Sequence, residues 1–314
     1  MVYLLPSPAG VHSGPGEGLG VRVSCFHRSN YEMLMVLLGV GSGLSWGVAD
    51  FFGGLQSRKM QALAVALWSQ IVGGIALLLV LLAWGGAYVP ERVGWGIGAG
   101  LFGGIGLVCF YRGLAVGTMS IVAPVAACGA VVPVIVALVM GEIPSLLTSL
   151  GMVLSIVGIV LVSLTSEGAP DPSSQPRLAL GLALGAAVGF GLFFVLLDQG
   201  AAVAVGSPLW AVGGARVGSL IMIAAMILFG PRSAPWPGRN IAIIGAVGVL
   251  DTLANALFAY AATLGNLGIV SVLGSLYPVA TVLLGRFVLG ERLTSLQQLG
   301  VACALVGVGL MSVG

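Results

Sequence analysis

Residues 43–47 read Gly-Leu-Ser-Trp-Gly and match the G-x-S-x-G pattern found around a hydrolase nucleophile. A catalytic serine at position 45 would need a strand-to-helix turn, a histidine base and an acid. The surrounding stretch is instead apolar, and the two histidines of the chain, His12 and His27, precede every apolar stretch. We therefore expect no nucleophilic catalysis at this motif and predict that Ser45 lies within a helix.

Two opposite charges and an amide fall deep inside apolar stretches. Asp251 lies at the middle of the stretch 241–261, where an aspartate costs about 2.5 to 3.5 kcal/mol on insertion into a bilayer. Arg216 lies about three residues from the middle of the stretch 209–229, close enough in depth to pair with Asp251. Asn255 follows Asp251 by one helical turn and shares its face. These residues form either an ion pair that fixes helix register or a site for a substrate or coupling ion.

A second candidate acid lies in the first apolar stretch. Asp50 follows Trp46 by four residues, on the same helix face and nearer the end of the stretch than its centre. It could pair with Arg112 near one membrane surface, or it could line a cavity unpaired and carry a proton. Trp46, Gln70, Tyr277 and Trp68 are further candidates for the lining of such a cavity, although a tryptophan within a span is more often a packing residue or an interfacial anchor.

Four residues are predicted to hold helix ends. Glu142 and Glu291 each precede a hydroxyl residue by three positions, Ser145 in the first case and Thr294 in the second. Thr294 and Gln297 have the spacing of a capping box, and a negative charge at a helix start suits the helix dipole. We expect a structural role for these residues rather than a place in the substrate pathway.

The composition places the whole chain in a lipid bilayer. Hydrophobic residues make up 58% of the 314 residues, charged residues 7%, and the mean hydropathy is +1.12. Such a chain cannot cover a water-facing surface with polar groups. It has no basic patch with interleaved aromatic residues, so we expect no nucleic-acid partner. The four cysteines lack the paired spacing of a metal site and the one lysine lacks a phosphate-binding loop, so we expect no metal, no cofactor and no ATPase activity.

The apolar residues fall into ten runs, which predicts an all-α polytopic membrane protein with ten transmembrane helices. Residues 1–32 are predicted to be a disordered N-terminal tail, and the polar segment 165–177 to be a linker between residues 33–164 and residues 178–314. The expected spans are 33–54, 63–84, 95–114, 120–140, 149–165, 178–197, 209–229, 241–261, 268–289 and 296–313.

The two halves resemble each other. The beginning of each half matches at an offset of 142 positions and the end at an offset of 149, which makes each half a repeat of five spans. Because five is odd, the second repeat would enter the bilayer from the opposite face, giving two inverted repeats. The residues that match are Gly39, Gly43, Gly47 and Trp68 with Gly181, Gly185, Gly189 and Trp210, and Tyr111, Gly141, Glu142, Gly151 and Gly158 with Tyr260, Gly290, Glu291, Gly300 and Gly307.

Three segments carry a resemblance to a known family: YRGLAVGTMSIVAPV at 111–125, YPVATVLLGRFVLGERLT at 277–294, and its weaker partner VPVIVALVMGEIPS at 132–145. With the tandem repeats, they make residues 33–313 similar to the EamA-type transporters of the drug/metabolite transporter superfamily. The resemblance implies a central substrate cavity with the fifth and tenth spans at the periphery. One departure is that Pro133 precedes Glu142 by nine residues whereas Pro278 precedes Glu291 by thirteen, which predicts helix breaks about a turn apart.

The expected function is secondary transport, as exporter or exchanger, of a small organic metabolite or drug across the cell (inner) membrane by alternating access. Energy would come from a gradient, with protons as one candidate coupling ion, or from the solute itself. The alternatives are a non-transporting membrane scaffold and an intramembrane enzyme acting on lipid. Positive charges are more numerous beside the odd-to-even loops, which places both termini outside the cytoplasm, whereas many relatives are described with both termini inside, so the orientation stays open.

Overall fold

The computed structural model describes residues 17–117, 119–163, 175–229, 234–288 and 294–313, and helices alone form the regular structure of these residues. Among these residues, seven helices are long and apolar enough to cross a bilayer, and three shorter apolar helices span 125–139, 146–161 and 295–311. The α-helices are α1 (Glu17–Ser57), α2 (Ala62–Trp84), α3 (Pro90–Val116), α4 (Met119–Ala127), α5 (Val131–Val139), α6 (Leu146–Ser163), α7 (Pro176–Ala202), α8 (Leu209–Leu228), α9 (Ile241–Ala262), α10 (Leu267–Gly274), α11 (Tyr277–Val288) and α12 (Ser295–Val313).

The first helix and the expected linker meet the limits of the described chain. Helix α1 begins at Glu17, inside the segment 1–32 that we expected to be a disordered tail. Residues 1–16 lie outside the described residues, as does most of the linker 165–177. Ser45 lies in the interior of α1, which is not the strand-to-helix turn that a nucleophile would need.

Two of the expected spans are broken near their prolines. Pro133 and Pro278 each remove a helical hydrogen bond and crowd the carbonyl four residues earlier, which belongs to Gly129 and Gly274 respectively. Gly129 lies in the short 3-10 helix η1 (Cys128–Ala130) between α4 and α5, and Gly274 ends α10 just before α11. The breaks therefore fall where the proline spacing predicts.

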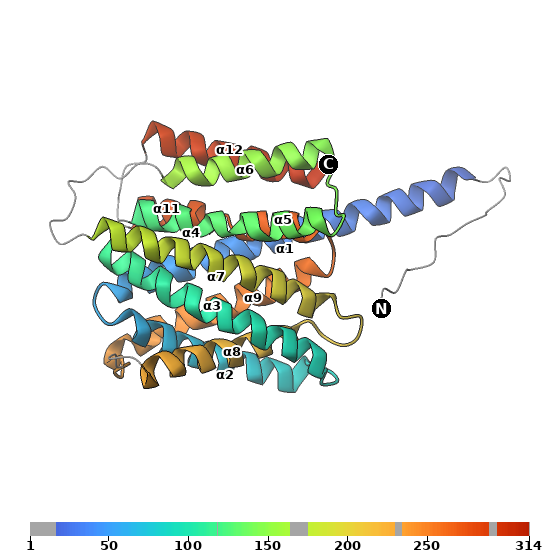
Figure 1. The fold of residues 1–314 in the computed structure, drawn as a ribbon. Helices are drawn as coiled ribbons and strands as arrows, with labels where there is room; N and C mark the ends of the chain where they lie inside the picture. The colour runs from blue at the N-terminus through green and yellow to red at the C-terminus, as the bar shows by residue number, and fades with distance from the viewer. Residues whose placement is uncertain (1–16, 118, 164–174, 230–233, 289–293, 314) are drawn as a thin grey trace.

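Helices from the first half of the sequence pack against helices from the second half (Figure 1). Helix α3 packs against α7 and α8, and helix α9 packs against α1 and α2. Helices α6 and α12 pack against each other and lie together at one edge of the bundle, where the family resemblance places the fifth and tenth spans (Figure 1).

Glycines bring these helix pairs into backbone contact. A Cβ added to Gly100 of α3 would lie 2.7 Å from the amide nitrogen of Ser219 on α8, and one added to Gly43 of α1 would lie 2.6 Å from the carbonyl oxygen of Leu273 on α10. No side chain larger than hydrogen fits at such positions. The G-x-x-x-G spacing in α1 and α3 thus serves close packing.

The edge pair α6 and α12 crosses at glycines that correspond in the two halves. A Cβ on Gly151 would lie 2.7 Å from the carbonyl oxygen of Gly307, and one on Gly158 would lie 2.7 Å from that of Gly300. Because lower numbers in α6 meet higher numbers in α12, the two helices run antiparallel.

Two matched tryptophans make the same contact with the halves exchanged. Trp68 of α2 donates a hydrogen bond to the carbonyl of Pro235 at 3.1 Å, and Trp210 of α8 donates one to the carbonyl of Gly85 at 3.0 Å. Each indole therefore fixes a loop of the other half. Each also makes an edge contact with a second aromatic ring.

The predicted helix-end residues contact backbone groups. Ser145 accepts a hydrogen bond from the Thr148 amide at 3.1 Å at the start of α6, and Thr294 and Gln297 make both hydrogen bonds of a capping box, at 3.0 and 3.3 Å. The second member of the acidic pair, Glu291, lies outside the described residues.

Glu142 lies between α5 and α6 and contacts the start of a third helix, α10. Its Oε2 accepts a hydrogen bond at 3.1 Å from the amide of Leu267, the first residue of α10. Burial raises the pKa of the Glu142 carboxyl above its ordinary value, and the Leu267 hydrogen bond opposes part of that rise. The carboxylate thus satisfies a free amide at the start of α10.

Arg92 has a helix-end role that its position in the sequence did not reveal. Its side chain is buried at the start of α3, and its guanidinium donates to carbonyls at and beyond the end of α7. These carbonyls carry the partial negative charge of a helix end, which a buried cation stabilises. They belong to Gly200, Ala201, Val203, Val205 and Gly206.

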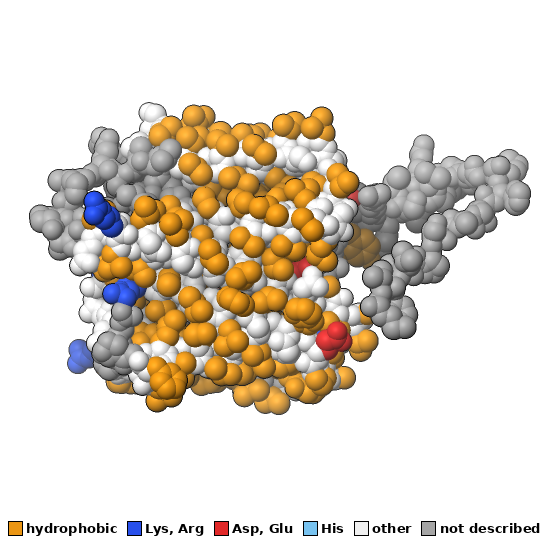
Figure 2. Space-filling model, viewed as in Figure 1, with side chains coloured by type: hydrophobic (Ala, Val, Ile, Leu, Met, Phe, Trp, Pro, Cys, Tyr) orange, Lys and Arg blue, Asp and Glu red, His pale blue; other side chains and the backbone are white. Residues whose placement is uncertain are grey.

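The outer surface suits a lipid environment. Hydrophobic side chains cover the face of the bundle drawn in Figure 2. On this face, Lys and Arg side chains gather at the left end, toward which α1 runs, and Asp and Glu side chains at the right end (Figures 1 and 2). The charges thus mark the two ends of an apolar belt.

Candidate functional site

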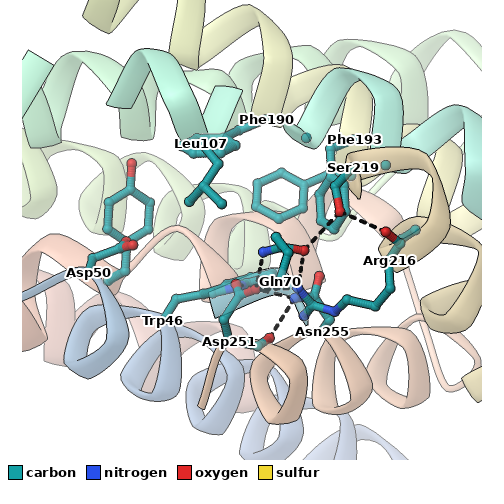
Figure 3. Close-up of a pocket in the computed structure, with 15 residues that line it drawn as sticks. Trp46, Asp50, Gln70, Leu107, Phe190, Phe193, Arg216, Ser219, Asp251 and Asn255 are labelled. Atoms are coloured by element: carbon teal, nitrogen blue, oxygen red, sulfur yellow. Dashed lines mark hydrogen bonds and ion pairs between the residues drawn. The ribbon is translucent and has the colours of Figure 1, made fainter. Parts of the chain in front are cut away.

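A pocket lies in the middle of the bundle, lined by residues from α1, α2, α3, α7, α8, α9 and α11 (Figure 3). Its wall combines the two halves of the chain. Seven of the pathway candidates predicted from the sequence line it: Trp46, Asp50, Gln70, Arg216, Asp251, Asn255 and Tyr277. The eighth, Trp68, does not line this pocket and donates a hydrogen bond to the carbonyl of Pro235 instead.

An ion pair of Arg216 and Asp251 forms the polar centre of this pocket. The Nη1 atom of Arg216 lies 2.5 Å from Oδ2 of Asp251, and 7% and 16% of the two side chains are exposed. The charges therefore compensate each other in a site largely withdrawn from water. Helix α8 supplies the guanidinium and helix α9 the carboxylate, as the depth of the two residues predicts.

Gln70 joins the ion pair to the first half of the chain. Its Nε2 donates to Oδ2 of Asp251 at 3.1 Å, and its Oε1 accepts from Nη1 of Arg216 at 2.5 Å and from Oγ of Ser219 at 2.8 Å. The amide therefore bonds to both charges at once. Ser219 was missed in the sequence, although it lies three residues after Arg216, on the same helix face.

The other oxygen of Asp251 is also occupied. The indole Nε1 of Trp46 donates to Oδ1 at 3.0 Å, and Nδ2 of Asn255 lies 3.4 Å from the same atom. The Asn255 amide makes a shorter hydrogen bond, 2.5 Å, to the backbone carbonyl of Asp251. Both carboxylate oxygens of Asp251 thus have partners, whose side chains converge in Figure 3.

The cluster leaves several polar atoms without partners. Nε and Nη2 of Arg216 and Oδ1 of Asn255 are buried and make no hydrogen bond among the described residues. An unmet buried donor or acceptor costs about 1 to 3 kcal/mol, and more on a charged group. This arrangement is therefore incompletely satisfied, as expected of a site that also forms other contacts.

Asp50 lies in the same pocket, apart from the cluster (Figure 3). It is 9% exposed, and no hydrogen bond or ion pair joins its side chain to any residue that the structure describes. The alternative of an Asp50 ion pair with Arg112 is wrong. The sequence predicts the depth of these two residues in the membrane but not the direction in which each side chain leaves its helix.

Aromatic rings form the remaining wall. Phe190, Phe193 and Phe194 of α7 line the pocket, and Trp46 lies 5.4 Å from Phe194 and 6.5 Å from Phe193 between ring centroids. A further ring, Phe258, stacks on Phe194 at 4.9 Å. We did not single out these phenylalanines in the sequence, because aromatic residues in an apolar span are usual in lipid-facing and in packed positions alike.

Within the described parts of the chain, no three His, Cys, Asp or Glu side chains lie together in a way that could hold a metal ion. The groups that the pocket offers are therefore one paired and one unpaired carboxylate, a guanidinium, two amides, the hydroxyls of Ser219 and Tyr277, and aromatic faces. Such a set can bind a small polar organic molecule with an apolar part.

Comparison with known proteins agrees with this architecture. Residues 33–164 and 177–313 each match the EamA-like transporter family. A solved structure, described only as the crystal structure of a protein, superimposes with a TM-score of 0.69 over 88% of this chain and 97% of that chain. The two sequences are 19% identical, so this likeness concerns the fold alone. No curated protein is similar enough in sequence to count as a match.

Proposed function

Because the chain belongs to the EamA-like transporter family, we propose that it is a secondary carrier that moves a small organic metabolite or drug across the cell membrane. In this proposal the chain crosses the bilayer ten times, as two inverted repeats of five helices. The central pocket opens alternately to the two sides. The observation that carries the proposal is a polar pocket built from both halves of an apolar bundle.

The inverted arrangement is supported by contacts that recur with the halves exchanged. Helix α3 packs on α7 and α8, while its counterpart α9 packs on α1 and α2. The antiparallel crossing of α6 and α12 pairs Gly151 with Gly307 and Gly158 with Gly300. Exchanging matched residues leaves this set of contacts unchanged, as a two-fold axis in the membrane plane requires.

The polar cluster is suited to switching between two states. The Arg216 to Asp251 ion pair lies within the second half, whereas the hydrogen bonds of Trp46 and Gln70 to Asp251 connect the halves. Each such bond contributes about 1.5 to 3 kcal/mol when one partner is charged. These hydrogen bonds between the halves can therefore break while the ion pair within the second half stays intact.

The two alternative functions receive less support. A scaffold subunit needs no central polar pocket, and a charged cluster at that depth is costly to keep without a use. An intramembrane enzyme acting on lipid is disfavoured by the transporter family to which the chain belongs. We propose that transport is driven by a gradient of protons or of the solute itself.

Asp251→Asn tests the proposed site. The amide would keep the size of the side chain but remove the charge that pairs with Arg216, so transport should fall at least about tenfold. Proteoliposomes are loaded with a cell metabolite extract, and the compounds that they release are followed by mass spectrometry. Glu91→Gln, an exposed acid outside the pocket, serves as the control and should leave release unchanged. Equal release by Asp251→Asn and the wild type would remove this site from the transport pathway.

A further inference from the structure

Asp50 is an acid in the pocket for which no residue that the structure describes provides a counter-charge. It is more than nine-tenths buried, it lines the pocket, and it has no hydrogen bond or ion pair within the described chain. A carboxylate withdrawn from water in this way is stable only with a proton or a cation beside it.

The other charges of the pocket cannot serve this purpose. Arg216 of α8 is held by Asp251 of α9, and its charge is thereby neutralised. The other titratable groups that face Asp50 from packed helices are Tyr111 of α3 and Tyr277 of α11, and neither carries a positive charge. The pocket thus contains two acids and one base, which leaves it one positive charge short.

The surroundings of Asp50 also favour an organic cation. Leu107 and Phe190 line the pocket together with Asp50 (Figure 3), so part of the wall that encloses the carboxylate is apolar and aromatic. Aromatic faces attract cations, and a hydrocarbon or aromatic body would bury its surface against the same wall.

From this combination we propose that the transported solute carries a protonated amine, and that Asp50 binds this group while the aromatic wall holds the body of the solute. This inference rests on the proposed carrier function. Asp50 would recognise the positive charge of the solute, whereas the Asp251 cluster would connect the two halves.

Three ligands of similar size that differ in charge test the proposal: cationic 2-phenylethylamine, neutral 2-phenylethanol and anionic phenylacetate. Radiolabelled 2-phenylethylamine is bound to the full chain in lipid nanodiscs at neutral pH, and the other two compete with it. The amine should bind the wild type most tightly, and Asp50→Asn should weaken its binding at least about tenfold. Asp50→Glu, which restores the charge, should bind the amine more tightly than Asp50→Asn does.

Asp198→Asn is the matched control, because Asp198 is a second buried carboxylate that does not line the pocket. It should bind the amine as the wild type does. The proposal is overturned if phenylacetate or 2-phenylethanol binds as well as the amine, or if Asp50→Asn binds the amine as well as the wild type, which would leave a proton as the only partner of Asp50. If that result came with loss of flux in Asp251→Asn, the cation site would be wrong and the carrier function would stand. Unchanged flux in Asp251→Asn would instead count against the proposed site.

Discussion

Arg216→Met should lower the free energy of unfolding by about 3 to 5 kcal/mol and abolish transport. Methionine fills much of the space of the arginine side chain but leaves the buried Asp251 carboxylate without its counter-charge. The Oε1 atom of Gln70 would also lose its hydrogen bond from the guanidinium. Thermal unfolding of the purified protein in detergent, followed by size-exclusion chromatography, measures the loss.

The double variant Arg216→Met with Asp251→Leu separates lost charge compensation from lost packing. Removing both charges together replaces the ion pair by apolar side chains, which is often neutral for stability. The double variant should therefore unfold at a higher temperature than Arg216→Met alone, and it should still fail to transport. A double variant less stable than the single one would show that the pair is not the source of the effect.

Gly100→Val should lower the free energy of unfolding by about 3 kcal/mol or more. A side chain at this position of α3 would run into the backbone of α8 at Ala215 and Ser219. Backbone atoms cannot rotate away as a flexible side chain can, so the two helices would have to separate. Because Gly100 and Ala215 also line the pocket, transport should be lost together with stability. Thermal unfolding and metabolite release are the two readouts.

Gly181→Val is the matched control for this clash. Gly181 lies within α7, is exposed, and has no atom within 4 Å of an added Cβ. The same change there should shift the unfolding temperature little, because valine costs a helix only a fraction of a kcal/mol relative to good helix formers. Similar losses at positions 100 and 181 would mean that backbone contact between α3 and α8 is not what the glycines provide.

Several features of the fold and site follow from the sequence because the bilayer makes polar groups costly. Asp251 and Arg216 lie at similar depths in neighbouring apolar stretches, and an isolated charge there would be several kcal/mol less favourable than a paired one. The pairing could therefore be predicted without coordinates, and the structure has it at 2.5 Å. The break at Pro133 was predictable for a similar reason, since its ring crowds the carbonyl of Gly129.

Other features depend on the rotation of each helix about its axis, which the sequence of one chain does not determine. Phe193 lines the pocket, yet nothing in its spacing separates it from lipid-facing neighbours. Asp50 and Arg112 were predicted as a possible pair from depth alone, but the two side chains form no ion pair in the structure. The role of Arg92 could not be predicted from the sequence, because the carbonyls that it binds come from residues more than a hundred positions away.

Ser219→Cys, in a chain whose four native cysteines are replaced, shows whether a single pocket faces the two sides of the membrane in turn. Ser219 lines the pocket on α8 and is 6% exposed, so a thiol there differs little in size and reports on access to the pocket. A membrane-impermeant thiol reagent is added to one side of oriented proteoliposomes at a time. We expect labelling from each side, with a transported solute slowing both reactions. Labelling from one side only, or from neither side, would contradict it.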